Sequence, residues 1–384
     1  MRFQVSKRDL TAALAVVGSS VSASGPDISS HFTFRRTDLD GGKHGLEILT
    51  YTGRIFSSCP LQGVDMADPG TDTAFTIESW RLKQWLNNIA ADAAPEFTLT
   101  DREVVVRVKR GKQTFQSLDP KTFPYWDKAL KKAESKARLP ADRLAAALSY
   151  SRQFASDEET KKPEFCICEV RDGILQSSDK KAATLIRVAG LEKSDLRVHA
   201  KDVGGFLTFL GNLGDGEVEV LEHERMLLLR CCATQATFGE ARFHFQFPLT
   251  KVNIDDIDQH TWTLPKEDLQ QIIGFLISGA KKEDNRLHLA PGSEDGEILV
   301  SMANTTGKDT SMTLSGVTKA SQDKAPSIPE EGFTIDHTFL AKVLSPWKED
   351  NIVLGINVQG DKGFVRLARE SNGCKFLTVL PWLR

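Results

Sequence analysis

The chain has 384 residues, of which 40% are hydrophobic and 26% are charged, and its formal net charge at pH 7 is -3. This composition predicts a soluble globular protein with several packed cores, and the lack of any run of about 20 apolar residues argues against a membrane span. The near balance of 49 basic and 52 acidic residues argues against a generic high-affinity nucleic-acid binder but leaves room for local basic patches. Because the first residues alternate like a strand and do not form a signal peptide, we expect a cytoplasmic protein.

The first third of the chain predicts two one-sided helices packed on strands. After the opening strand, residues 10–17 place apolar side chains at i, i+3, i+4 and i+7, and residues 82–89 repeat this spacing. A strand-like run at 45–52 lies between the two helical patterns, and alternating residues at 97–108 follow the second. The segment closes on Phe123-Pro124. Its predicted order is β-α-β-β-β-α-β-β.

This order returns twice, at intervals of roughly 125 residues, which indicates an internal repeat. The later helical patterns lie at 144–148, 203–210, 269–276 and 340–347, and the later strand-like runs at 173–178, 217–231, 296–302 and 351–367. The second copy closes on Phe247-Pro248 and the third on Leu380-Pro381-Trp382. We therefore predict an α+β chain with three similar domains, at residues 1–125, 126–255 and 256–384.

The motifs of several enzyme classes are missing from the sequence. It contains no phosphate-binding loop, no dinucleotide fingerprint, no nucleophile elbow and no zinc-protease helix. The six cysteines lack zinc-knuckle spacing and are interpreted as reduced structural thiols. Asp255, Asp256 and Asp258 are interpreted as a solvated acidic run in the second linker rather than as metal ligands. We therefore expect no enzymatic activity, no cofactor and no metal.

Taken together, these features resemble the bacterial-type sliding clamp, the β subunit processivity factor of replicative DNA polymerase. The resemblance covers the whole chain and rests on the three copies, the paired helices, the two Phe-Pro closures and the C-terminal Pro between large apolar residues. Its departures would fit a divergent or phage-encoded member. The resemblance implies three clamp domains per chain, each with two helices on antiparallel sheets, and a closed homodimeric ring around duplex DNA. The implied partners are a replicative polymerase, an ATP-dependent clamp loader and other clamp-binding peptides.

A ring around DNA needs basic side chains on the helices that line its hole. Such side chains lie away from the apolar stripes at Arg8, Lys83, Arg143, Arg152, Lys201, Lys281, Lys282, Lys342 and Lys348. Contacts from these residues to phosphates would carry no base information, so binding would be independent of sequence and compatible with sliding. The alternative interpretation is that they are the solvated faces of surface helices.

The resemblance also implies a pocket for partner peptides between the second and third domains. The positions that match it are Phe165, Pro248, Leu380, Pro381 and Trp382. The family's Thr-Asp-Gly-His-Arg-Leu stretch is poorly kept, because residues 178–183 read Ser-Asp-Lys-Lys-Ala-Ala. This departure indicates a different peptide preference. The alternative for the last residues is a terminal strand whose Trp packs on its own domain.

Ring closure would join an edge strand of the first domain to one of the third domain in the partner chain. The resemblance places Phe115 against Leu276 and Ile277 across this contact, while ordinary core packing is the alternative for Leu276. Two other functions remain open at this stage. One is a structural repeat protein without DNA inside, and the other is a non-closing, monomeric polymerase accessory factor.

Overall fold

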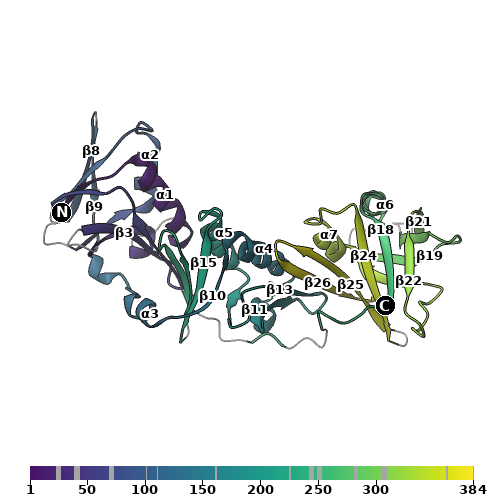
Figure 1. Cartoon of the computed structure of the whole chain (residues 1–384). Coiled ribbons are helices and arrows are strands. Elements are labelled where there is room, and N and C mark those ends of the chain that lie inside the picture. The colour runs from purple at the N-terminus through teal and green to yellow at the C-terminus, as the bar shows by residue number, and fades with distance from the viewer. Residues whose placement is uncertain are drawn as a thin grey trace. The chain divides into compact units, whose positions relative to one another are not determined.

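A computed structural model describes residues 1–384 except 23–26, 39–43, 69–72, 101, 110, 161, 225, 242–245, 249–252, 281–283, 304–308, 360–361 and 384. The chain divides into two compact units. The first contains residues 1–148 and 190–244, and the second contains residues 149–189 and 245–384. Figure 1 labels the elements of both. The division into three domains stays a prediction.

The first unit contains two antiparallel sheets. The smaller sheet has the order β5 (Asp65–Asp68), β1 (Arg2–Gln4), β7 (Glu96–Thr100), β8 (Glu103–Val108) and β9 (Gly111–Gln116). The larger sheet has the order β10 (Glu134–Pro140), β15 (Glu217–His223), β16 (Met226–Cys231), β17 (Thr237–Ala241), β4 (Ile55–Leu61), β3 (His44–Tyr51), β2 (His31–Asp38) and β6 (Ala74–Glu78). The short strand β14 (Arg197–His199) also lies in this unit.

The helices of the first unit follow the apolar stripes of the sequence. Helix α1 (Lys7–Val17) is capped by Ser6, whose hydroxyl accepts the Asp9 N–H, and it buries Leu10, Ala13, Leu14, Val16 and Val17. Helix α2 (Ser79–Asn87) buries Ser79, Leu82 and Leu86. The unit also contains α3 (Asp127–Lys132), α5 (Val203–Gly211) and the start of α4 (Ala141–Arg152).

Strands β4 and β17 join the first two sequence copies into one sheet. Their register pairs Thr237 with Ser58 and Gly239 with Phe56. A Cβ atom at Gly239 would overlap the Phe56 ring, so only glycine fits this contact. Gly205 has a related role, because a Cβ there would approach the Phe238 ring to 3.1 Å. The glycines therefore permit close packing of α5 and of β4 on β17.

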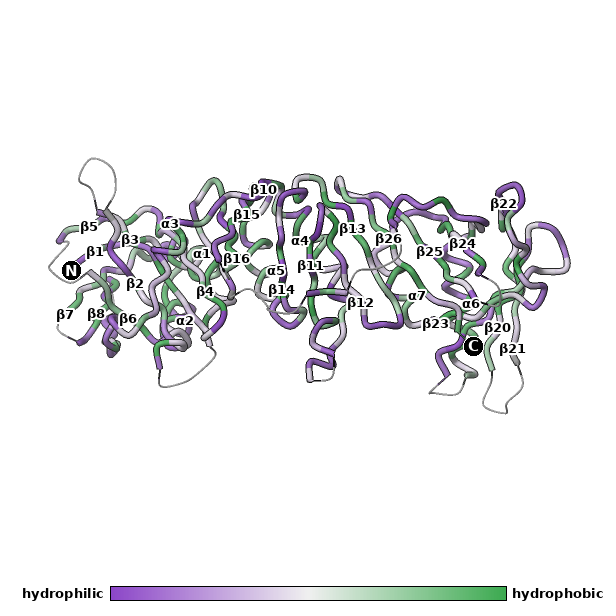
Figure 2. Tube along the Cα trace, turned by 90° about the horizontal axis from the view of Figure 1, so that it is seen from below, coloured by the Kyte–Doolittle hydropathy of each residue, from purple (hydrophilic) through white to green (hydrophobic). Residues whose placement is uncertain are grey.

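The second unit contains a long antiparallel sheet and a four-stranded one. The long sheet runs β11 (Ile167–Arg171), β12 (Ile174–Ser178), β13 (Ala183–Val188), β26 (Cys374–Pro381), β25 (Lys362–Ser371), β24 (Asn351–Gln359), β18 (His260–Pro265) and β22 (Thr318–Ser321). The other has the order β21 (Asp309–Leu314), β20 (Ile298–Ala303), β19 (Arg286–Pro291) and β23 (Phe333–Asp336). In Figure 2 the colour changes repeatedly along these strands, as is expected when one face of a sheet meets a core.

The described part of the second unit contains two complete helices. Helix α6 (Lys266–Gly279) buries Leu269, Ile272, Ile273 and Leu276 and packs on β20 and β21. Helix α7 (His337–Leu344) is capped by the Asp336 carboxylate, which accepts the Thr338 N–H. Because Pro346 cannot continue a helix, α7 ends before Trp347, which the sequence pattern had included.

The α+β fold with one-sided helices on antiparallel sheets is confirmed, but each copy has more strands than predicted. Among the residues that the structure describes, four or five strands separate the two helices of a copy, and three follow the second helix. The missed strands include β5, β14, β22 and β23, which have three or four residues each. Such short segments contain too few alternations to be recognised. The short helix α3 was missed for the same reason.

Candidate nucleic-acid and partner interfaces

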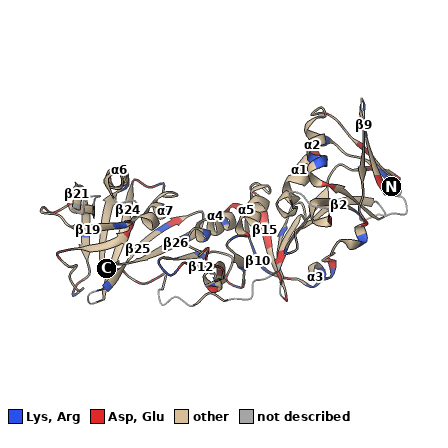
Figure 3. Cartoon of the chain, turned by 180° about the vertical axis from the view of Figure 1, so that it is seen from behind, with Lys and Arg blue, Asp and Glu red and all other residues tan. Residues whose placement is uncertain are grey.

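The basic side chains expected to face DNA lie in or beside helices. Arg8 is in α1, Lys83 in α2, Arg143 and Arg152 in α4, Lys201 just before α5, Lys342 in α7 and Lys348 just after it. All of these are exposed except Arg143, which is half-buried. Lys281 and Lys282 lie outside the described residues. Figure 3 shows the Lys and Arg positions on the helices, including those of α2.

Lys83 has an unusual environment for a surface lysine. Its Nζ lies 5.4 Å from the centre of the Phe32 ring, and a Cβ atom at Gly18 would be 3.6 Å from it. This partial burial lowers the pKa of the Lys83 ammonium, with no carboxylate among the causes. Within the described part of the chain, Lys83 has no acidic partner.

Lys342 is held close to its own unit. Its Nζ donates a hydrogen bond of 3.2 Å to the carbonyl oxygen of Gln153 and lies 4.9 Å from the centre of the Phe339 ring. Phe339 in turn stacks on Phe154, with ring centres 6.4 Å apart. The ammonium therefore links α7 to the segment that follows α4.

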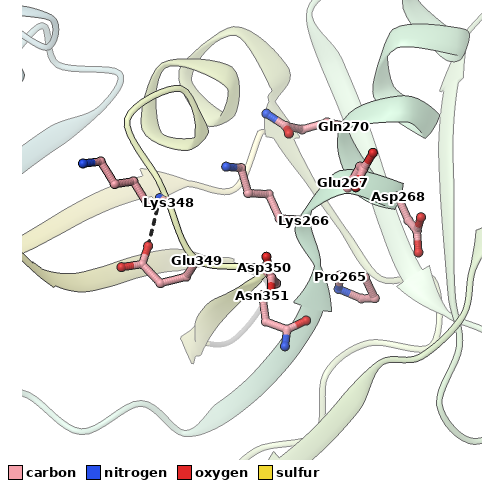
Figure 4. Close-up of a pocket in the computed structure, with 9 residues that line it drawn as sticks. All are labelled: Pro265, Lys266, Glu267, Asp268, Gln270, Lys348, Glu349, Asp350 and Asn351. Atoms are coloured by element: carbon pink, nitrogen blue, oxygen red, sulfur yellow. Dashed lines mark hydrogen bonds between the residues drawn. The ribbon is translucent and has the colours of Figure 1, made fainter.

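Lys348 borders a polar pocket of about 570 Å³ at the start of α6 (Figure 4). Its lining combines two lysines with four acids: Lys266, Lys348, Glu267, Asp268, Glu349 and Asp350. Lys266 donates to the carbonyl oxygen of Trp347, and the Lys348 N–H donates to Glu349 at 3.1 Å. The mixed charge gives this pocket no clear preference for an anion or a cation.

The C-terminal strand β26 sends neighbouring residues to opposite sheet faces. Leu380 is 1% exposed and pairs with Val365, whereas Pro381 is exposed and pairs with Phe364. Trp382 stacks on Phe333, with ring centres 5.5 Å apart and planes at 14°. Trp382 thus packs within residues 256–384, as the alternative interpretation expected. The assignment of these residues to a peptide pocket stays a prediction.

Phe165 and Pro248 belong to a second group of residues. The Phe165 ring meets Phe247 edge-on, with centres 5.8 Å apart, and Lys180 Nζ lies 4.8 Å from the Phe165 ring centre. The Phe247 N–H donates to the buried Glu169 carboxylate at 2.5 Å, which fixes the chain just before the exposed Pro248. Sequence reasoning noted Lys180 only as a departure from the family stretch, not as a neighbour of Phe165.

The acidic run of the second linker is exposed at Asp255 and Asp256, as a solvated segment would be, and Asp255 and Asp258 also form ion pairs. Asp255 accepts two hydrogen bonds from Arg187, at 2.9 and 2.5 Å, and one from Lys375 at 3.1 Å. These cations lower the pKa of Asp255 to about 2. Arg366, which is 3% exposed, bonds the Asp258 carboxylate at 3.2 Å and the Asp256 carbonyl at 2.5 Å. No amphipathic pattern could have revealed a buried arginine in β25.

Strand β9 ends a sheet of the first unit and strand β21 ends one of the second, and no other described strand pairs with their outer edges. Phe115 on β9 is 4% exposed and meets Trp85 edge-on, with centres 6.4 Å apart. Leu276 on α6 is 2% exposed. Both side chains belong to the cores of their own units, as the core-packing alternative for Leu276 expected. A direct role for them in dimer contact stays a prediction.

Three exposed apolar residues lie beside β21 in the described part of the chain, and one of them was predicted as a contact residue. Ile277 is 41% exposed, as a contact residue would be, and Phe275 is 58% exposed on the same helix. Leu299 on β20 adds a third exposed apolar side chain. Phe275 was missed because it lies off the apolar stripe, although an off-stripe aromatic is itself a signal of an unpaired surface.

This arrangement of elements is the fold of the bacterial sliding clamps, the β subunits of DNA polymerase III. The chain aligns over 100% of its length with the DNA polymerase III subunit beta from Pseudomonas aeruginosa, at a TM-score of 0.76 and 13% identity, covering 100% of that chain. The sliding clamp from Bartonella birtlesii, solved with griselimycin bound, gives 0.76 and 16% over 100% of both chains. The C. crescentus beta sliding clamp gives a TM-score of 0.77 and 15% identity, covering 100% of this chain and 99% of that one. No family model and no curated protein matches the sequence.

No described helix is both long and apolar enough to cross a membrane. Among the same residues, no group of three or more His, Cys, Asp or Glu side chains is placed to hold a metal ion.

Proposed function

We propose that this protein is a DNA sliding clamp, a binding protein that performs no chemistry. Two copies would close head to tail into a ring around duplex DNA and hold a replicative polymerase on its template in the cytoplasm. The observation that carries this proposal is the agreement in fold over the full length of known clamps. Since a fold can serve several functions, the proposal also rests on the surfaces of this chain.

The outer strands support ring closure. Strand β9 and strand β21 each end a sheet with one edge unpaired, and edge strands of two chains can join by main-chain hydrogen bonds. Phe275, Ile277 and Leu299 lie beside β21 and would be covered in such a contact. A stable contact of this kind buries about 1,200 to 2,000 Å² in total.

The helices support binding that does not depend on sequence. Their basic side chains occur singly and among acids, which favours weak phosphate contacts over tight adhesion. A net charge of -3 fits the same interpretation, because retention would come from encirclement and not from affinity. An ATP-dependent loader would then be needed to open the ring.

The second unit offers the surfaces for partner peptides. Pro248 is exposed beside the Phe165–Phe247 pair, and Pro381 is exposed at the end of β26. We expect short peptide segments of the polymerase, the loader and other replication proteins to bind here. Lys180 beside Phe165 favours a peptide with an acidic residue near its apolar side chains.

The test is retention on circular and linearised plasmid after loading, in salt high enough to suppress phosphate binding. We expect retention on circles and loss from linear ends. Equal retention on both would contradict encirclement. Loss from both, with a control clamp loading normally, would favour a structural repeat protein or a non-closing accessory factor, and sedimentation analysis would separate these by oligomeric state.

A further inference from the structure

Helix α2 has an exposed stripe that contains no acidic residue. Its buried side consists of Ser79, Leu82 and Leu86. The exposed positions Trp80, Lys83, Gln84 and Asn87 follow at spacings of three and four, so they share one side of the helix, next to the buried side. Neither the resemblance to clamps nor the apolar pattern assigns a role to a tryptophan here.

One carboxylate orients the two largest side chains at the start of this helix. Glu78 accepts the indole N–H of Trp80 and pairs with the Arg81 guanidinium at 2.8 Å. The Arg81 guanidinium carbon lies 5.3 Å from the centre of the Trp80 ring. The indole is still 44% exposed, so an aromatic surface is held in a fixed orientation toward solvent.

Lys83 adds a positive charge one turn further along the same stripe. Arg81 offsets the charge of Glu78, whereas Lys83 has no acidic partner among the described residues. Because its ammonium is partly desolvated against Phe32 and Gly18, a phosphate would provide the counter-charge that the protein does not. The stripe therefore combines an aromatic face, an unpaired cation and two amides.

We propose that this stripe of α2 is a binding site for single-stranded DNA, in which an unpaired base stacks on Trp80 and a phosphate contacts Lys83. The choice of DNA as ligand rests on the proposed function. A base in duplex DNA has both faces covered by its neighbours, whereas an unpaired base can stack on an exposed indole. The site would therefore hold the unpaired strand next to a duplex, in addition to the sequence-independent contacts made to the duplex itself.

The test is fluorescence anisotropy of the full chain with a labelled 20-nucleotide oligothymidylate and with a 20-base-pair duplex. Replacing Trp80 by Ala should weaken single-strand binding by about fivefold or more, because one stacked base is lost. Binding to the duplex should not change. Trp80→Phe keeps an aromatic face and should retain most of the affinity. The control Tyr125→Ala removes an exposed aromatic ring outside α2 and should leave both affinities unaltered.

A second variant tests the phosphate contact. Lys83→Gln should reduce the slope of log affinity against log salt by about 0.7 for the single strand, the value for one phosphate. The proposal would be overturned if Trp80→Ala bound the single strand as tightly as wild type. It would also be overturned if this variant lost equal affinity for the single strand and the duplex. So would an unchanged salt slope in Lys83→Gln.

These outcomes are separate from those of the plasmid test. A wild-type chain that fails to stay on circular DNA would contradict the clamp function without changing the oligothymidylate measurement. Conversely, a Trp80→Ala variant could stay on circular DNA normally and also bind the single strand as tightly as wild type. That result would overturn only the single-strand site.

Discussion

The two linkers of the chain begin alike and then cover their sheets in different ways. After Phe123-Pro124, the first linker buries Phe123 and Trp126 in a cluster with Phe56 and Leu228, and it continues into α3. In the described part of the second linker, Phe247 is buried beside Phe165, and Ile254 is buried against Leu185, Leu377 and Val379. The first linker fills its sheet face with aromatic rings, whereas the second is fixed mainly by ion pairs.

This difference bears on where a partner can bind. Arg35 pairs with Asp127 at 2.6 and 2.7 Å and lies 4.9 Å from the centre of the Tyr125 ring, so the first linker is fixed by charge as well as by packing. Pro248 of the second linker is exposed, as is Pro124 of the first, and the second unit also exposes Pro381. A sheet face already filled by its own linker has no room for a peptide. The comparison therefore favours the second unit as the partner surface.

The largest expected effect concerns the aromatic packing of the first linker. Trp126→Ala should lower the free energy of unfolding by about 3–5 kcal/mol, because a large ring that is 7% exposed leaves a cavity. Urea unfolding followed by circular dichroism measures this loss. The matched control is Tyr125→Ala, whose ring is 39% exposed and should contribute much less. Equal losses from the two variants would contradict the comparison.

The next effect concerns the buried arginine under the second linker. Arg366→Met should lower the free energy of unfolding by about 2–3 kcal/mol, because Asp258 and the linker carbonyls lose a charged donor. The same urea measurement applies. Arg187→Met removes a cation that is 45% exposed, so its effect should be far smaller. A larger loss in Arg187→Met would show that surface charge, and not the buried donor, fixes this linker.

A third prediction concerns the pH dependence of the first unit. Burial raises the pKa of Glu240 to about 9, with Asp202 beside it adding to the shift and Arg54 opposing it. Between the unfolded value of about 4.5 and the folded one, the native state holds the extra proton, so stability falls as pH rises. Glu240→Gln should flatten this decline, by up to about 1 kcal/mol per pH unit. Urea midpoints at pH 6, 7 and 8 measure it, and parallel slopes for the two proteins would contradict it.

The smallest expected effect is a pH dependence in the second unit, where stability falls as pH decreases and not as pH rises. Since Arg187 and Lys375 lower the pKa of Asp255 to about 2, its ion pairs contribute stability above the unfolded pKa. That contribution is lost as pH falls from about 4 to 2. Asp255→Asn should therefore be slightly less stable than wild type near neutrality and unfold at a slightly higher pH in an acid titration, and the difference should vanish near pH 2. An unchanged acid midpoint would argue against a role for these pairs.

The sequence predicted the features that repeat locally and missed those that depend on distant neighbours. The stripes of α1, α4 and α6 were found because a helix shows its buried side every three or four residues. The environment of Lys83 was not predictable, because Phe32 and Gly18 come from other elements. Likewise, nothing near Arg366 in sequence indicates that the second linker folds over it. The candidate basic positions could be named, but their partners could not.

The pairing of β4 with β17 has a consequence for folding during synthesis. Ser58 and Thr237 meet across it through a hydrogen bond of 2.7 Å, although 179 positions separate them in the chain. During synthesis, β4 must therefore wait for β17 with one edge unpaired, and an open edge is a site of aggregation. A truncated chain that ends after the first copy would keep this edge permanently. We expect the larger sheet of the first unit to complete its folding only after Gly239 has emerged from the ribosome.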